Sequence, residues 1–305
     1  MSSAVYPTFG ICNLSASRSG DDLLNADLLG PYITGNPHLQ AMHNHSFYHM
    51  VYFRLGGGTH TIDFETFPVE PGMIYFMKPG QVHVWNFDGI PEGYIVNFSP
   101  VFFDRLFISS GFIDRFPFFI PGTGRQVLLL PEERRAHTEE LLEAVLREQQ
   151  GQEPSSQLMI AALLIELFLW VDRYSEQKYR HEPPSYQSAV LRRFEQLVEE
   201  HFRSKRLPRE YAELLHITPS HLNALCRDLL GTSAGELIRN RVVLEARRLL
   251  VNFELSVSGV AAELNFPDTS YFIRFFKKYN GLTPEQFRRS FRPQQHMHTH
   301  EEQTY

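Results

Sequence analysis

The sequence predicts an α+β multidomain protein, with a β-barrel or sandwich and a helical hairpin in the N-terminal part and an all-α C-terminal part. Short apolar and aromatic runs, broken by Gly and Pro between His43 and Ser99, are typical of strands. Helical periodicity begins at Pro131. After Leu207, a short helix, a turn and a longer helix occur twice, which is the pattern of a helix-turn-helix.

Composition indicates a soluble globular protein, because 43% of the 305 residues are hydrophobic and 21% are charged. Cys12 and Cys226 are the only cysteines, so we expect neither a disulfide framework nor a cysteine zinc site, and a reducing compartment. The segment Met1–Leu14 lacks the pattern of a secretory signal. The longest apolar run, Leu158–Val171, contains Glu166 and is shorter than the about 20 residues of a membrane span. We therefore expect a cytoplasmic protein without membrane contact.

The net charge of −6 hides an asymmetry between the two halves. Between Ser188 and Arg292 there are 17 basic and 12 acidic residues, a balance of +5. The rest of the chain has 12 basic and 23 acidic residues, a balance of −11. A basic module attached to an acidic one indicates contact of the basic part with nucleic acid.

Turn signals in the N-terminal part come at short, fairly regular spacing, which favours a small all-β barrel or sandwich. They are Gly56-Gly57-Gly58, Pro71-Gly72, Pro79-Gly80 and Pro91-Glu92-Gly93. Residues 131–175 are expected to form two antiparallel helices, separated at Gly151–Ser156. The second helix is apolar on all sides, so it should pack on the barrel, on a partner chain or on both.

In the first helix-turn-helix copy, Arg209–Leu215 is the short helix, and His216 and Ile217 form the turn. Thr218 is predicted to cap the second helix, with Pro219 at its first position. The buried face is expected to hold Leu222, Leu225, Cys226 and Leu229, at i, i+3, i+4 and i+7.

In the second copy, Ser256–Leu264 is the short helix, Asn265 and Phe266 form the turn, and Asp268 is the cap. The apolar face is expected to hold Phe272, Phe275, Phe276 and Tyr279. A helix from Ser233 to about Asn252 joins the copies. Its about 20 residues span roughly 30 Å, close to the ~34 Å between successive major-groove faces of DNA.

The stretch Leu255–Arg288 (LSVSGVAAELNFPDTSYFIRFFKKYNGLTPEQFR) is very similar to the signature of the AraC/XylS family of transcription regulators. The first copy resembles the less uniform first helix-turn-helix of that family, and the resemblance covers about Ser188 to Phe291. Where the family often has Gly in the turn, this sequence has His216 and Asn265. Both residues tolerate a left-handed backbone better than most, so we expect the turns to form.

By position, the resemblance implies that the second helix of each copy reads bases. The corresponding residues are Ser220, Asn223 and Ala224 in the first copy, and Thr269, Ser270, Ile273 and Arg274 in the second. Asn can pair with adenine, Arg with guanine, and Ala224 can contact a thymine methyl. Arg227, Lys277 and Lys278 are expected to contact phosphates, which position the protein without specifying sequence.

His43, His45, Phe47 and His49 have the same parity, so an extended chain would direct them to one face. This part looks like the cupin-like barrel of AraC-type N-terminal domains, in which a His-x-His strand and a later His line the barrel mouth. We therefore predict an effector pocket at His43, His45, His49, His83 and Trp85. An aromatic lining of Phe47, Tyr48, Tyr52 and Trp85 suits a sugar or an aromatic acid.

No metal and no other cofactor is the favoured expectation, since family members that sense small organic molecules mostly lack metal. Metal-binding cupins also usually carry Glu where His49 stands. The alternative is that His43, His45, His49 and His83 hold zinc, iron or nickel. His296, His298 and His300 in the polar tail offer loose metal binding, but a tail without function is favoured.

These observations predict a sequence-specific DNA-binding transcription regulator that responds to a small-molecule effector, and no enzyme. Activation, with RNA polymerase as a partner, is implied by the resemblance alone, and the hairpin suggests a homodimer. Two alternatives stay open: a cupin-type metalloenzyme with a helical appendage, and a ligand-independent DNA-binding regulator. The predicted divisions are a cupin-like sensor (1–130), a dimerisation hairpin (131–175), a linker (176–187), a DNA-binding domain of two helix-turn-helix units joined by a long helix (188–292) and a disordered tail (293–305).

Overall fold

The structure is a computed structural model that describes residues 7–14, 23–106, 112–113, 116–120, 125–151, 153, 155–179, 186–252 and 254–291. The chain divides into two compact units, one over Pro7–Arg241 and one that contains Val242–Tyr305. Because the division falls inside a helix, each unit contains one of the two predicted helix-turn-helix copies. The predicted tail, with its three histidines, lies outside the described residues.

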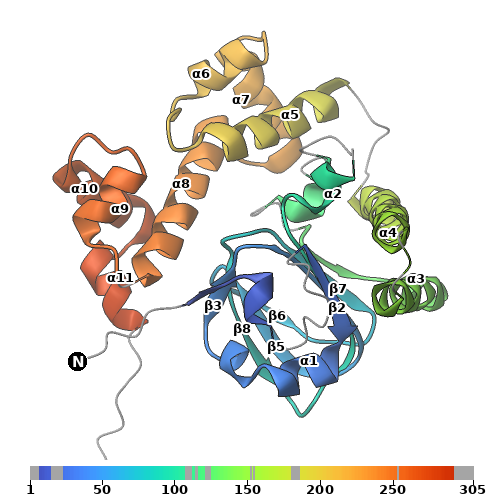
Figure 1. The fold of residues 1–305 in the computed structure, drawn as a ribbon. Coiled ribbons are helices and arrows are strands. Elements are labelled where there is room, and N and C mark those ends of the chain that lie inside the picture. Colours follow the sequence, from blue (N-terminus) through green and yellow to red (C-terminus); the bar gives the residue numbers. More distant parts are fainter. Residues whose placement is uncertain are drawn as a thin grey trace, which may run out of the picture. The chain divides into compact units, whose positions relative to one another are not determined.

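Two five-stranded sheets form the predicted barrel in the first unit (Figure 1). Neighbouring strands are antiparallel, except that the first pairs in parallel with the third. One sheet has the order β1 (Thr8–Phe9), β3 (His43–His45), β8 (Val82–Phe87), β5 (Gly58–Ile62) and β6 (Glu65–Pro68). The other has the order β10 (Val127–Leu129), β7 (Met73–Met77), β4 (Tyr48–Leu55), β9 (Glu92–Phe98) and β2 (Leu24–Leu28).

Alternation along the strands divides the apolar residues between two cores. On β4, Val51 and Phe53 point into the barrel, into a cluster that also contains Tyr75 and Ile95. The even-numbered residues Met50 and Tyr52 belong to a second core on the outer face of the β7–β4–β9 sheet. A short helix α1 (Leu29–Gly35) contributes Tyr32 to the inner core.

The helical hairpin covers that outer face, as Figure 1 shows for α3 (Glu132–Gln150) and α4 (Ser156–Tyr179). Helix α4 buries one stripe against the sheet, made of Ile160, Leu164, Leu167, Phe168 and Val171. The Phe-rich stretch contributes α2 (Phe102–Arg105) and a 3-10 turn (Pro117–Phe119), whose phenyl rings fill the same core. The predicted hairpin is therefore confirmed. Among the described residues, no helix is long and apolar enough to cross a membrane.

The predicted linker is shorter than expected at both ends. Helix α4 continues to Tyr179, and the next helix, α5 (Tyr186–His201), begins before Ser188. The first unit goes on with α6 (Pro208–Leu214), α7 (Pro219–Leu230) and the first part of α8 (Ala234–Val251). The second unit has the rest of α8, α9 (Val257–Glu263), α10 (Thr269–Asn280) and α11 (Pro284–Ser290).

For two residues on the predicted apolar faces of the longer helices, the prediction is wrong because their side chains are exposed. Leu229 and Tyr279 are each 40% exposed, while Leu222, Leu225, Cys226, Phe272 and Phe276 are buried as expected. Both exposed residues lie in the last turn of a 12-residue helix. Each of these helices packs against a preceding helix of only 7 residues, which covers less of its length.

Candidate DNA-binding surfaces and sensor site

Both helix-turn-helix turns contain one non-glycine residue in the left-handed backbone conformation. His216 and Asn265 each have φ 56°, and the residue after each closes the turn with a backbone hydrogen bond. Ile217 N–H donates to Ala212 O at 3.0 Å, and Phe266 N–H donates to Ala261 O at 2.9 Å. The expectation that both turns form without Gly is confirmed. An αL residue that ends a helix in this way satisfies carbonyls that would otherwise lack partners.

The longer helices are also capped as predicted. The side chain of Thr218 accepts from His221 N at 3.2 Å, and that of Asp268 accepts from Tyr271 N at 2.7 Å. Each helix ends at a glycine with positive φ, Gly231 and Gly281. Every position of α7 thus has a counterpart 50 residues later in α10. This register allows the two outer faces to be compared residue by residue.

On α7, two of the predicted base-reading residues, Ser220 and Ala224, are exposed, and Asn223 is half-buried. The amide of Asn223 already has partners within the protein. Its Nδ2 donates to Pro219 O at 3.1 Å, and its Oδ1 accepts from Ala234 N at 3.2 Å, at the start of α8. A bidentate contact with adenine needs both of these amide atoms, so it would have to use the second hydrogen of Nδ2 and the second lone pair of Oδ1.

On α10, the predicted readers Ser270 and Arg274 are exposed, and Thr269 and Ile273 are half-buried. The predicted phosphate contacts Arg227, Lys277 and Lys278 are exposed as well. Lys278 lies over the Tyr279 ring, with its Nζ 5.3 Å from the ring centroid. All the predicted readers therefore lie on one outer face of their helix, and α10 presents more positive charge than α7.

Two buried arginines, which sequence reasoning missed, connect helices within each unit. Arg241 in the first half of α8 forms an ion pair with Glu199 of α5 at 2.6 Å, and its guanidinium lies 3.9 Å from the centroid of the Phe202 ring. Arg288 of α11 donates from Nε to Leu250 O at 3.1 Å and from Nη2 to Leu255 O. Sequence gave no sign of these roles, because a helix carries many arginines and only packing shows which are buried.

The sensor site is a cluster of histidines inside the barrel. His43, His45, His49 and His83 are at most 2% exposed, as is His60 on β5, which sequence reasoning did not single out. His60 Nε2 lies 3.0 Å from His83 Nδ1. The only sequence signal for His60 was its place in the strand-like run HTIDF. Its proximity to His83 depends on the pairing of β5 with β8, which no local pattern specifies.

Burial keeps all five imidazoles neutral at pH 7, because a charged ring inside the barrel would be desolvated. It lowers the pKa of His43 to about 4 and that of His49 to about 3. The pKa values of His45, His60 and His83 are also lowered well below their usual range by burial.

Several buried polar atoms of the cluster have no hydrogen-bond partner in the described part of the chain. They are His45 Nδ1, His49 Nε2, His60 Nδ1 and Trp85 Nε1. Asn97 of β9, which was also missed, accepts at Oδ1 from His49 Nδ1 at 2.7 Å and fixes that ring. Orphaned polar atoms gathered in one interior are a sign of a binding site, because such atoms are otherwise costly to bury.

The predicted aromatic lining is half wrong. Phe47 and Trp85 lie inside with the histidines, but Tyr48 and Tyr52 belong to the outer core. Tyr52 donates to Glu139 of α3 at 3.0 Å. The even parity of these two tyrosines, opposite to that of the histidines, was the signal that should have excluded them.

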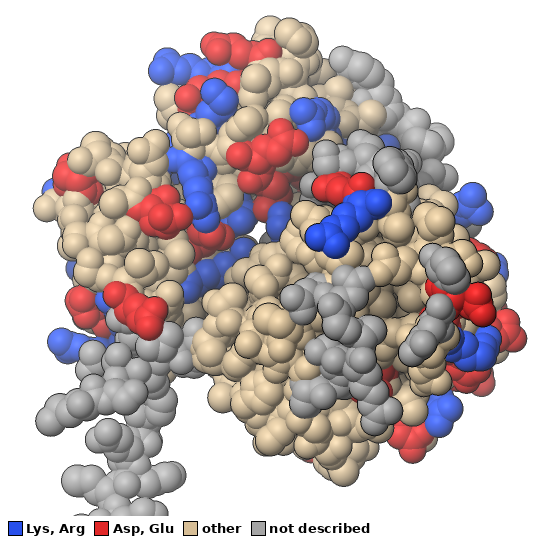
Figure 2. Space-filling view, in the orientation of Figure 1, with Lys and Arg blue, Asp and Glu red and all other residues tan. Residues whose placement is uncertain are grey.

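The barrel's surface differs from its interior. Figure 2 shows that the barrel face turned to the viewer carries few charged side chains. A cleft of about 910 Å³ lies between the Ile90–Tyr94 segment, α1 and α3. Its lining includes Arg54, Tyr94 and Arg147 but none of the five histidines.

Comparison with known families finds two matching models. A model described as the AraC-like ligand binding domain matches residues 26–168, and a model described as a helix-turn-helix domain matches residues 211–290. The first match covers most of the barrel and most of the hairpin. The second covers both helix-turn-helix copies.

Relatives with both parts are known in several bacteria. The chain is 27% identical over 229 residues to the arabinose operon regulatory protein of Salmonella typhimurium, with 73% of this chain and 77% of the relative covered. It is 25% identical over 269 residues to the uncharacterized HTH-type transcriptional regulator YfiF of Bacillus subtilis, with 81% and 78% covered. It is 20% identical over 257 residues to the HTH-type transcriptional activator RhaR of Yersinia pestis, with 82% and 84% covered.

Proposed function

This chain is an AraC-family transcription regulator, with an N-terminal ligand-binding domain and a C-terminal helix-turn-helix domain that binds double-stranded DNA. From this we propose that it is a homodimer that activates transcription in the cytoplasm. In this proposal an effector in the barrel controls how α7 and α10 are presented to two successive major grooves. The observation that carries it is the repeated, capped and exposed pair of helices 50 residues apart.

For DNA recognition we propose that the N-terminal halves of α7 and α10 enter the major groove. Ser220, Asn223 and Ala224 would face bases from α7, and Thr269, Ser270, Ile273 and Arg274 from α10. Arg227, Lys277 and Lys278 lie nearer the helix ends and would contact phosphates. Helix α8, with 18 residues, spans about 27 Å, which suits two readers on adjacent turns of one DNA face.

For effector binding we propose the barrel interior around His49, Trp85 and Phe47. The orphaned His49 Nε2 and Trp85 Nε1 offer hydrogen bonds to a ligand, and Phe47 offers an apolar face. A ligand can regulate DNA binding only if it binds two states of the protein with different affinity.

We propose that the chain dimerises through α4, which would pack against α4 of a second copy. On the side away from the sheet, α4 carries an apolar stripe at Leu158, Ala162, Ile165 and Leu169, with the alternating spacing of four and three residues found in coiled coils. Leu158 is 55% exposed and Ile165 and Leu169 are half-buried, so the stripe is not fully covered by this chain. We propose activation and contact with RNA polymerase for this chain because one relative, RhaR, is named as a transcriptional activator. The absence of enzyme activity is proposed from relatives that are all named as regulators.

The test is selection of bound duplexes from a random DNA pool with the full-length protein, followed by affinity measurements at several salt concentrations. We expect one enriched motif with two half-sites about one helical turn apart and affinity that falls steeply with salt. Enrichment of no motif would contradict sequence-specific binding. The exposed Arg147→Ala on α3 is a control for loss of one positive charge far from α7 and α10 in sequence, and it should bind the selected DNA like the parent.

Effector dependence is tested by a metabolite screen read through tryptophan fluorescence. The only two tryptophans, Trp85 and Trp170, lie in the barrel and in helix α4 of the hairpin, so their unfolding transition reports that part of the chain. A compound that raises the temperature of this transition and changes the affinity for the selected DNA supports regulation by an effector. If no screened compound changes DNA binding and the dimer depends on the barrel, the result favours the ligand-independent regulator.

A further inference from the structure

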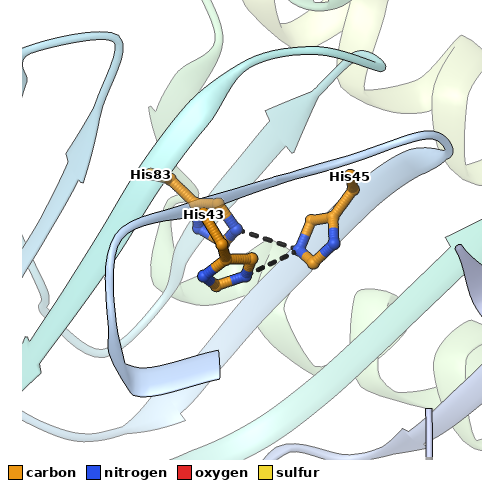
Figure 3. Close-up of side chains that lie close together, drawn as sticks. All are labelled: His43, His45 and His83. Atoms are coloured by element: carbon orange, nitrogen blue, oxygen red, sulfur yellow. Dashed lines mark hydrogen bonds between the residues drawn. The ribbon is translucent and has the colours of Figure 1, made fainter. Parts of the chain in front are cut away.

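Three imidazole nitrogens converge inside the barrel from two strands, as Figure 3 shows for His43 and His45 of β3 and His83 of β8. His45 Nε2 lies 3.2 Å from His43 Nε2 and 2.9 Å from His83 Nε2. The ligand atoms of the three residues all lie within 4.8 Å of one another, and the three side chains are buried.

Hydrogen bonds alone satisfy this arrangement poorly. His43 Nδ1 donates to Ala41 O at 2.7 Å, so the neutral ring has a lone pair on Nε2. The contact with His45 then requires the proton on His45 Nε2, and the contact of His45 with His83 requires that same proton. The lone pairs of His43 Nε2 and His83 Nε2 thus share the one hydrogen on His45 Nε2, although a neutral imidazole can donate well to only one acceptor.

The neighbouring bonds orient the lone pairs inward. Because His83 Nε2 accepts, His83 Nδ1 carries a proton and donates to His60 Nε2 at 3.0 Å. His43 is oriented in the same way by the Ala41 carbonyl. Metal-binding histidines in proteins typically donate their second ring N–H to such an acceptor, which fixes the tautomer and the ring direction.

The spacing fits a small transition-metal ion. With Zn–N bonds of about 2.0–2.1 Å, nitrogens at tetrahedral angles lie about 3.3 Å apart. The contacts of His45 Nε2 with His43 Nε2 and His83 Nε2, 3.2 and 2.9 Å, reach that separation with small movements of the rings. A cation at the centre would replace the shared proton and satisfy all three lone pairs.

We propose that His43, His45 and His83 bind one divalent first-row transition-metal ion, with Zn²⁺ as the best match, in the sensor barrel. His60 is a positioning residue, because it acts on the ion only through His83. Three neutral ligands leave the ion with two positive charges in a buried interior, so the open fourth position favours an anionic oxygen donor such as a carboxylate.

The experiment uses the full-length, untagged protein with His296, His298 and His300 changed to Ala, so that histidines close together in sequence outside the barrel do not contribute to binding. After treatment with chelator, the protein is titrated with Zn²⁺ and, as a coloured probe, with Co²⁺. We expect one ion per chain, a Co²⁺ absorption spectrum typical of nitrogen donors, and a higher unfolding temperature by tryptophan fluorescence. Substoichiometric binding overturns the proposal.

Variants separate ligands from bystanders. His45→Leu, which keeps the site apolar and filled, should weaken binding by at least about 100-fold, whereas His60→Leu should weaken it by about 10- to 100-fold. The exposed His38→Ala is the matched control and should bind as the parent does. Equal binding by His45→Leu and the parent would show that the cluster is only a hydrogen-bonded core.

Two further readouts do not depend on a variant that folds. X-ray absorption of the Zn²⁺-loaded parent should show three imidazole donors, and a spectrum without them excludes this site. Acetate should shift the Co²⁺ spectrum if the fourth position is open, and no shift overturns that part. None of these measurements requires DNA, so their failure is distinct from failure of the proposed regulatory function.

Discussion

The two helix-turn-helix units share a backbone and differ in what their surfaces carry. Both have an αL turn at φ 56°, a polar cap and a glycine stop. The caps and stops are 50 residues apart, and the turn residues His216 and Asn265 are 49 apart. At equivalent positions, α7 has Ala224 and Asp228 where α10 has Arg274 and Lys278. A few local residues thus maintain the backbone geometry of each unit, and the side chains on the outer face can differ without changing it.

The cores differ in the same way. Cys226 in α7 and Phe276 in α10 occupy equivalent buried positions. Burial raises the pKa of the Cys226 thiol to about 11, so it stays protonated and acts as a small apolar group, as predicted. Phe276 packs against Phe272 and Phe287, and the second core therefore depends on aromatic rings.

The largest effect is expected from emptying these cores. Phe276→Ala should destabilise the second unit by about 3–5 kcal/mol, because it removes a buried ring and leaves a cavity, while Cys226→Ala should cost about 1 kcal/mol in the first. Hydrogen exchange measured by mass spectrometry, peptide by peptide, reports each unit separately. Faster exchange in α7 after Phe276→Ala would show that the two units unfold together and would break the comparison.

The next effect concerns Arg274. Arg274→Ala should weaken binding to the selected DNA by about 1–3 kcal/mol and relax the base preference at one position, because a bidentate contact with guanine is lost. Lys277→Ala should weaken binding to all sequences alike and lower the salt dependence by about one charge. Repeating the DNA selection with each variant checks this, and equal loss of preference in both contradicts the division into readers and phosphate contacts.

Asn223 provides a test of the first unit. Asn223→Ala removes the acceptor for Ala234 N–H, so we expect a loss of helix-capping stability of about 1 kcal/mol at the start of α8. If Asn223 also reads adenine, base preference at one position should change. Asn223→Asp, which keeps the acceptor and removes the amide donor, is the matched control: a preference unchanged in both variants assigns Asn223 to structure alone.

Exchanging the charges at the equivalent positions 228 and 278 tests whether charge alone distinguishes the outer faces of α7 and α10. Asp228→Lys gives α7 the charge found at Lys278 in α10, and it should raise affinity for all DNA sequences by up to about 1 kcal/mol at low salt. Lys278→Asp should have the opposite effect. Fluorescence anisotropy at two salt concentrations measures both, and a change confined to the preferred motif would mean that position 228 or 278 reads sequence.

The smallest effect is expected at the turns. His216→Gly and Asn265→Gly should each change stability by less than about 1 kcal/mol, with the larger gain at His216, because Asn tolerates the αL region well. Valine at either position should destabilise by about 1–2 kcal/mol, since a β-branched residue fits this region poorly. Exchange of the Ile217 and Phe266 amides, which close the turns, is the local readout.

Much of this molecule follows from local sequence. The caps at Thr218 and Asp268, the αL turns and the apolar spacing were all predictable, because each depends on residues that lie within about two helical turns in sequence. The shared parity of His43, His45 and His49 also placed them on one face without knowledge of the fold. For these features the chain's own geometry decides the outcome.

Other features were decided by tertiary structure. His60 joins the histidine cluster because β5 pairs with β8, and Asn97 fixes His49 because β9 pairs with β4. Arg288 becomes an internal link only when α11 meets the end of α8. Leu229 remains exposed because the 7-residue α6 leaves the end of α7 uncovered. Each depends on contacts between residues distant in sequence, for which a single chain has no local signal.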